Sequence, residues 1–199
     1  MSRLSPHPLL AAALCILACA APAPRHGVSL EPPIPRPTFT LTDTRGKAYD
    51  FARETRGRLT FLFFGYTNCP DVCPVHVSNV AAVLHKLSFE DQQRSAFVFV
   101  TVDPARDSLP AVRAWLDHFD KTFVGLRGDA ALVDSLMGTL GLPPAIRAAP
   151  TEPNGWYEVG HAAPVIVFTA DDVARVMYPF GTRQLDWAED IPRLLKVGR

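Results

Sequence analysis

Two runs of consecutive apolar residues dominate the hydrophobic pattern of the chain. Residues 59–64 (LTFLFF) and 96–102 (AFVFVTV) are almost entirely apolar, which is typical of strands that are covered on both faces of a sheet. Other short segments alternate or are briefly apolar, and they predict further strands at residues 39–43, 123–126, 164–168 and 173–178.

Apolar residues recur at helical spacing between these strands. After Pro74 the spacing predicts a helix, and proline suits its first turn because the missing N–H costs little there. Further helices are predicted over residues 110–119, 129–140 and 186–196, with Pro192 either bending the last one or lying near its start. Residues 141–155 are irregular. Strands that alternate with helices predict one α/β layered domain.

The N-terminal segment has the parts of a secretory signal. Arg3 precedes an apolar run over residues 9–18, which is shorter than the roughly 20 residues of a membrane span. The order Ile16-Leu17-Ala18-Cys19 resembles a bacterial lipobox. We therefore expect residues 1–18 to be a lipoprotein-type signal peptide and Cys19 to be lipidated, with an uncleaved anchor or a plain cleaved signal as the alternatives.

The segment that follows is rich in proline. Proline cannot donate a backbone hydrogen bond and favours extended conformations, so residues 19–37 are predicted to form a semi-rigid tether. The folded domain is then expected over residues 38–199. The chain is predicted to be exported and held by its lipid at the periplasmic face of a bacterial membrane.

The net charge excludes one class of partner. The 199 residues include 20 basic and 20 acidic side chains, a formal net charge of zero, without the basic footprint of a nucleic-acid-binding protein. The partner must therefore be recognised by something other than overall charge.

Two cysteines are the strongest chemical signal. Cys69 and Cys73 stand where the predicted strand over residues 59–64 meets the helix that follows Pro74. Backbone N–H groups and the helix dipole lower the pKa of a thiol at such a junction. Two thiolates form a soft ligand set that favours Cu(I) or Zn(II), but they are too few for a closed zinc site. A third ligand is needed, and the candidate is His161, just before the strand predicted at residues 164–168.

Three separated motifs resemble one family. Residues 65–74 (GYTNCPDVCP) and 101–107 (TVDPARD) resemble signatures of the SCO/SenC family, the copper chaperones for cytochrome c oxidase assembly, and His161 falls where that family carries its copper-binding histidine. The resemblance extends over roughly residues 37–195. It implies a thioredoxin-like fold with a central mixed sheet flanked by helices.

The resemblance also implies a site and a partner. Cys69, Cys73 and His161 would bind copper, as Cu(I) or Cu(II), and Asp71 would be an acid that supports the two cysteines. The recipient would be the copper-bearing subunit of cytochrome c oxidase, or another copper or thiol-redox protein. Two positions beside the histidine depart from the family pattern, because Gly160 stands where Asp is common and Pro164 where an aliphatic residue is usual.

Other functions of the cysteine pair remain open. The pair could form a structural disulfide, although so short a loop would stabilise little. It could instead be the redox pair of a thiol-disulfide oxidoreductase. Such enzymes usually have two residues between the cysteines and this pair has three, which argues against that function. A third alternative is a peroxidase-like enzyme in which Arg106 or Arg127 stabilises the attacking thiolate. None of these residues by itself indicates that the protein is an enzyme.

A few further residues have weaker expectations. His76 is expected to point to solvent on its helix and to be no more than a substitute ligand. Asp103 and Arg106 are expected to be structural: Asp103 closes a strand, and Arg106 with Asp107 ties the following loop by charge-assisted hydrogen bonds.

Overall fold

The computed structural model describes residues 26–149 and 156–198. Among these residues, eight strands form one mixed sheet in the order β1-β10-β9-β4-β5-β6-β2-β3. The strands are β1 (Val28–Pro35), β2 (Thr40–Asp43), β3 (Ala48–Asp50), β4 (Leu59–Gly65), β5 (Ser95–Thr101), β6 (Val124–Arg127), β9 (Val165–Phe168) and β10 (Val173–Tyr178). A separate hairpin joins β7 (Ile146–Arg147) to β8 (Val159–Gly160).

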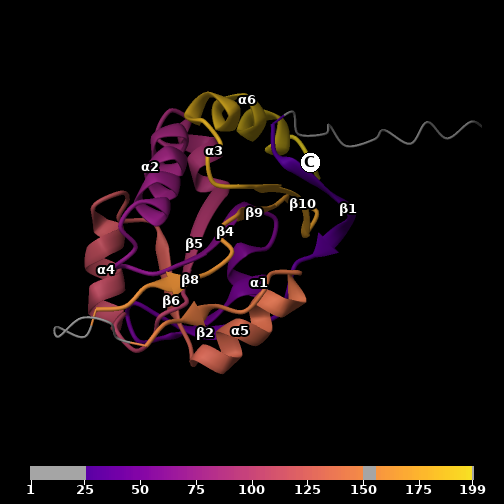
Figure 1. Ribbon diagram of the computed structural model, residues 1–199. Coiled ribbons are helices and arrows are strands. Elements are labelled where there is room, and N and C mark those ends of the chain that lie inside the picture. Colours follow the sequence, from indigo (N-terminus) through magenta and orange to yellow (C-terminus); the bar gives the residue numbers. More distant parts are fainter. Residues whose placement is uncertain (1–25, 150–155, 199) are drawn as a thin grey trace, which may run out of the picture.

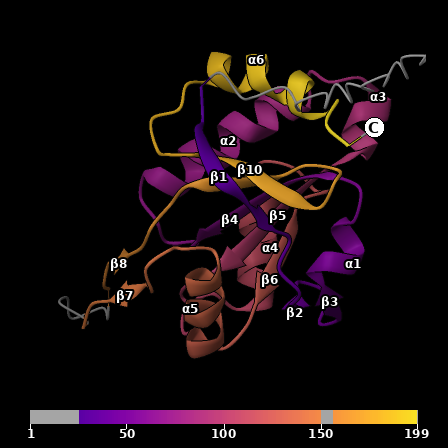
Figure 2. The ribbon, with the colours of Figure 1, turned by 90° about the vertical axis from the view of Figure 1, so that its right-hand side faces the viewer.

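Helices cover both faces of this sheet (Figures 1 and 2). They are α1 (Phe51–Thr55), α2 (Val72–Leu84), α3 (Phe89–Gln93), α4 (Leu109–Asp117), α5 (Ala130–Thr139) and α6 (Gln184–Leu194). Helix α6 packs beside α2 on one side, and α5 lies on the other side of the sheet (Figure 2). Within the described ranges, no helix has both the length and the apolar character that crossing a membrane requires. The predicted α/β fold with a central mixed sheet is confirmed.

The two apolar runs form the centre of the sheet. Every residue of β4 and β5 is buried, and the two strands pair in parallel from Leu59 opposite Ser95 to Gly65 opposite Thr101. Strand β9 pairs antiparallel with the other edge of β4, with Val165 opposite Phe63. The carboxyl end of β4 and the start of β9 therefore meet at one edge of the sheet, and this edge positions the site.

The tether prediction is wrong for Val28–Pro35. These residues form the edge strand β1, which pairs antiparallel with β10, and the register shifts between Ser29 and Ile34. Pro32 and Pro33 lie within that irregularity, where the regular hydrogen-bond ladder is interrupted. Prolines are tolerated at edges and bulges because no ladder hydrogen bond is lost there. Residues 1–18, Cys19 and the rest of the segment before residue 26 lie outside the described residues.

A buried arginine fastens the end of β1 to the domain. The Arg36 guanidinium donates to Asp172 Oδ1 at 2.8 Å and Thr55 Oγ1 at 2.7 Å. It also donates to Thr60 Oγ1 and to the carbonyl oxygens of Arg58 and Thr169. The guanidinium carbon lies 5.1 Å from the centre of the Phe168 ring. The planar fork of arginine satisfies this set of acceptors, which a lysine could not do.

The structure decides between alternatives for Pro192 and corrects the expectation for His76. Pro192 lies inside α6, two residues before its last residue Leu194, so the alternative that it lies near the start of the helix is excluded. His76 does not point to solvent, because α2 is covered by α6 and the His76 side chain is 2% exposed between Phe63 and Trp187. Burial lowers the pKa of His76 to about 4, so its imidazole is neutral at ordinary pH.

We predict that Arg36→Met lowers the free energy of unfolding by about 3 kcal/mol, because it leaves several buried acceptors without a donor. Arg53→Met is the matched control, since Arg53 is an exposed arginine paired with Glu54, and it should leave the free energy of unfolding nearly unchanged. Urea unfolding of the two variants measures the difference. Equal losses in both would show that β1 is not fastened by Arg36.

Candidate metal centre

The loop that carries the cysteines is fixed at its start by a buried carboxylate. Asp107 is fully buried and accepts hydrogen bonds from Thr67 N at 3.0 Å, Thr67 Oγ1 at 2.6 Å and Thr101 Oγ1 at 2.6 Å. Burial raises the pKa of Asp107. The hydrogen bonds join the residue after Tyr66 to the end of β5, so the loop leaves β4 in one defined direction.

Gly65, the last residue of β4, makes room for one of the two sulfurs. A Cβ atom at Gly65 would stand 3.0 Å from Cys73 Sγ and 2.9 Å from a ring carbon of Phe99. Contacts below about 3.4 Å cannot be held without movement of a neighbour. The Cys73 thiol is fully buried, and it occupies the space that any other residue at position 65 would need.

Helix α2 begins between the two cysteines. Asp71 is its N-cap, and its side chain accepts from Val72 N at 2.6 Å. Cys73 N donates to Cys69 Sγ at 3.3 Å, so the Cys69 sulfur also accepts from the first turn of the helix. The expectation that the pair stands at a strand-helix junction is met by this geometry, and Pro74 lies in the first turn of α2.

The two thiols differ strongly in acidity. Both cysteines are free, and a hydrogen bond from the Cys73 side chain is the largest influence on Cys69, whose pKa falls to about 6. The N–H groups of Cys73 and Asp71 lower it further, against the effect of burial. The same pairing raises the pKa of Cys73, and burial adds to that effect. At neutral pH the pair therefore holds one proton, and Cys69 is the thiolate.

His161 reaches the cysteines from a segment far along the chain. It follows β8 and precedes β9, which begins beside the end of β4. Its Nε2 lies 3.9 Å from Cys73 Sγ. Burial lowers the pKa of His161, so the imidazole is neutral, the form in which histidine binds metals.

These distances suit an ion between the side chains. A metal held by sulfur at about 2.3 Å and nitrogen at about 2.0 Å, with a wide angle between them, leaves the two donor atoms about 3.5–3.8 Å apart. The Cys73–His161 separation of 3.9 Å is within a few tenths of that. Within residues 26–149 and 156–198, no group of three or more His, Cys, Asp or Glu side chains is placed to hold a metal ion.

A hollow of about 250 Å³ opens onto Cys69 and His161. Its charged lining residues are Asp71 and Glu158, and none of its lining residues is Lys or Arg. A concave surface that carries one sign of charge attracts ions of the other sign. The hollow therefore favours the approach of a cation to the thiolate.

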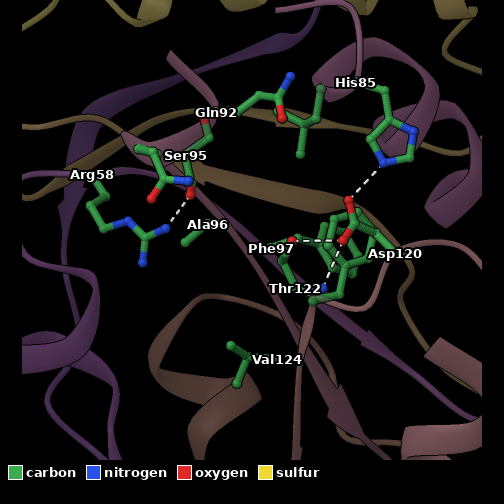
Figure 3. Close-up of a pocket in the computed structure, with 12 residues that line it drawn as sticks. Arg58, His85, Gln92, Ser95, Ala96, Phe97, Asp120, Thr122 and Val124 are labelled. Carbon is green, nitrogen blue, oxygen red and sulfur yellow. Dashed lines mark hydrogen bonds and ion pairs between the residues drawn. The ribbon is translucent and has the colours of Figure 1, made fainter. Parts of the chain in front are cut away.

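A second hollow, of about 180 Å³, lies at the opposite end of the sheet, where β5 and β6 begin (Figure 3). Several of its polar groups already have partners. Arg58 donates to the carbonyl of Ser95, and His85 Nε2 lies 2.7 Å from Asp120 Oδ2. Thr122 also donates to Asp120. The groups do not converge on a common point, in contrast to those at the carboxyl end of β4.

The structure also locates the remaining candidate residues. Asp103 pairs with Arg106, as expected for a structural role, whereas Asp107 contacts Thr67 and Thr101 and not Arg106. Gly160 is free of close neighbours, because a Cβ atom there would find nothing nearer than 3.9 Å. Tyr66, which the sequence presented only as part of a motif, lines the hollow with its ring against His161.

Comparisons with known proteins agree with this geometry. Residues 29–196 match the family profile described as SCO1/SenC. A Stutzerimonas stutzeri protein named "Putative copper-binding protein" is 35% identical over 142 residues, which are 70% of this chain and 66% of that protein. The chain thus spans just under two thirds of the length of that curated relative.

Two solved structures have the same fold. Bradyrhizobium japonicum ScoI with copper bound has a TM-score of 0.70 and 30% identity, over 81% of this chain and 99% of that chain. The apo Sco1 protein of Thermus thermophilus has a TM-score of 0.74 and 28% identity, over 85% and 96% of the two chains. The thioredoxin-like fold expected from the sequence is confirmed by these likenesses.

We predict that Gly65→Ala destabilises the domain by about 2 kcal/mol, because the added methyl group must displace the Cys73 sulfur or a core phenylalanine. Gly160→Ala, where the space is open, should cost less than about 0.5 kcal/mol. Chemical unfolding of the reduced protein compares the two. A harmless Gly65→Ala would contradict the close packing of Cys73 against β4.

The different acidities of the thiols predict selective alkylation. In the reduced protein, iodoacetamide should modify Cys69 first, and the rate should rise as pH passes through about 6, because thiolate forms above that pKa. Cys73→Ala removes the hydrogen-bond donor, so the rise should move to higher pH. Mass spectrometry of the modified peptide reports the site. Faster modification of Cys73 would contradict this assignment.

Proposed function

The chain belongs to the SCO1/SenC family, and from this premise we propose that it is an exported copper chaperone that binds one copper ion through Cys69, Cys73 and His161. Its proposed recipient is the copper-bearing subunit of cytochrome c oxidase, whose binuclear copper centre it helps to mature. The periplasmic location and the lipid anchor at Cys19 belong to the same proposal.

The observation that carries this proposal is the donor set at the end of β4. The Cys73 thiol is hydrogen-bonded to Cys69, and its sulfur lies 3.9 Å from Nε2 of the neutral His161 imidazole. Soft thiolate ligands with an imidazole select copper or zinc over hard cations. The copper-bound state named for the Bradyrhizobium japonicum relative supports copper as the choice.

Each residue of the proposed site has a different role when the copper ion binds. Cys69 lines the hollow and is the thiolate, so it meets an arriving cation first. Cys73 then loses its proton to solvent as the ion replaces it, since metal-bound thiols are deprotonated. His161 needs no proton loss because burial already favours its neutral form. Asp71 orders the turn between the two sulfurs by capping α2.

We expect the reduced full chain to bind one Cu(I) in an anaerobic titration against a competing chelator. Cys69→Ser and Cys73→Ser should each weaken binding by more than about a hundredfold, and His161→Ala by about tenfold, because removing a ligand costs at least as much as removing a residue that orients one. His118→Ala is the control, since His118 is exposed at the end of α4, and it should bind copper as the wild type does. A wild type that binds no copper would refute the proposal.

One observation supports a second function, a thiol-disulfide oxidoreductase. The low pKa of Cys69 beside the buried Cys73 thiol is the arrangement of an attacking and a resolving cysteine. The Cys69 thiolate would attack a partner's disulfide and release one partner thiolate. Cys73, losing its proton, would then attack Cys69 of the mixed disulfide and release the second, leaving a Cys69–Cys73 disulfide.

His161→Ala distinguishes the two functions. The histidine takes no part in the exchange of disulfides, so the variant should reduce a small disulfide substrate as fast as the wild type while its copper affinity falls. If the variant keeps full copper affinity and the wild type exchanges disulfides rapidly, the oxidoreductase is the better assignment.

A further inference from the structure

His161 has few polar contacts to hold its ring in place. Among the described residues its only polar side-chain contact is the one to Cys73 Sγ, made by Nε2. Its Nδ1 has no hydrogen-bond partner there. A histidine that binds a metal usually donates its second ring nitrogen to a carboxylate or carbonyl, which fixes the orientation of the ring. Something else must orient this one.

The Tyr66 ring is placed to do so. Tyr66 directly follows β4, its side chain is 4% exposed, and its ring meets the His161 ring edge-on with the centroids 5.6 Å apart and the planes at 74°. Edge-to-face contacts of this kind are favourable and directional. The Tyr66 carbonyl also accepts from Cys69 N at 3.2 Å, so one residue contacts both halves of the site.

Tyr66 is itself supported on its other side. The Arg106 guanidinium carbon lies 5.7 Å from the Tyr66 ring centre and 3.6 Å from that of Tyr157. Asp103, fully buried, holds this group in place, since it accepts from Arg106 Nε and from the Tyr157 hydroxyl at 2.6 Å. A continuous row of side-chain contacts therefore runs from Tyr157 through Arg106 and Tyr66 to His161.

We propose that Tyr66 is the positioning residue of His161, and that its ring, supported by Arg106, holds the imidazole beside the cysteine pair. The expected effect on copper affinity rests on the proposed function, whereas the orientation of the His161 ring by Tyr66 does not. The Tyr66 hydroxyl also hydrogen-bonds to the Cys69 sulfur and to the Val159 backbone. Tyr66→Phe removes those contacts but keeps the ring against His161, whereas Tyr66→Leu removes both, so the difference between the two variants reports the ring. Tyr49→Leu is a matched control, because Tyr49 is a buried tyrosine of β3 and does not line the hollow.

The first test uses the reduced full chain without copper. Histidine side-chain NMR should show nuclear Overhauser contacts between the rings of residues 66 and 161 in the wild type and in Tyr66→Phe. In Tyr66→Leu the His161 signals should move towards those of the exposed His118, while Tyr49→Leu should leave them unchanged. His161 signals that stay unchanged in Tyr66→Leu would overturn the proposal, whether or not the protein binds copper.

The second test is a double-mutant comparison of Cu(I) affinity. Tyr66→Leu should weaken binding about tenfold, the size typical of a residue that orients a ligand. Tyr66→Phe, which keeps the ring, should retain clearly more of the affinity than Tyr66→Leu. In the His161→Ala background the two Tyr66 variants should bind copper equally, because the ring acts only through His161. A weaker affinity for Tyr66→Leu than for Tyr66→Phe in that background would show that the ring acts elsewhere. Absence of copper binding in the wild type would refute the proposed function and leave the NMR result to decide the role of Tyr66.

Discussion

The packing of the Cys73 sulfur against Gly65 is the constraint on which the site depends. The sulfur fills the space beside the last residue of β4 and is fully buried, so this proposed ligand is part of the hydrophobic core. Its position is set by the pairing of β4 with β5 and by the start of α2. Cys69, four residues earlier in the loop before α2, is then held at the rim of the same core by its contact with the Cys73 N–H. The packing of Cys73 against Gly65 therefore gives the pair one fixed, buried sulfur and, in Cys69, a second sulfur that is more accessible.

The other half of the site depends on strand pairing over a long separation in sequence. Strand β9 pairs with β4, and this pairing places the segment around His161 at the carboxyl end of β4. The Asp103–Arg106–Tyr157 group ties the same segment to the end of β5. Neither half forms the site alone, because the thiols lack a nitrogen donor and the histidine lacks an orienting hydrogen bond among the described residues. The site therefore exists only when the whole sheet is folded.

The sequence allowed the centre of the fold to be predicted because local pattern decides it. The all-apolar runs of β4 and β5 and the helical spacing after Pro74 need no knowledge of distant partners. The predictions that were wrong concern residues whose structure depends on contacts with segments far away in the sequence. Strand β1 was missed because prolines look incompatible with a sheet until an edge with an irregular register accommodates them. His76 was misplaced because α6 covers the face of α2 that would otherwise meet solvent. The contact of Asp107 with Thr67 spans 40 residues, a pairing that no local pattern reveals.

The charges at the site bear on how a chaperone could both hold copper and release it. The free pair carries one proton and one negative charge, so in the proposed function Cu(I) would replace the proton of Cys73 without changing the net charge. Two thiolates, one Cu(I) and a neutral imidazole would together carry the same single negative charge as the empty pair, which limits the cost of burying the ion. Asp71 and Glu158 attract the cation at the rim without binding it tightly, since both are exposed. A partner that offers more thiolates could therefore take the ion while Cys73 regains a proton from solvent, and the core would remain folded throughout.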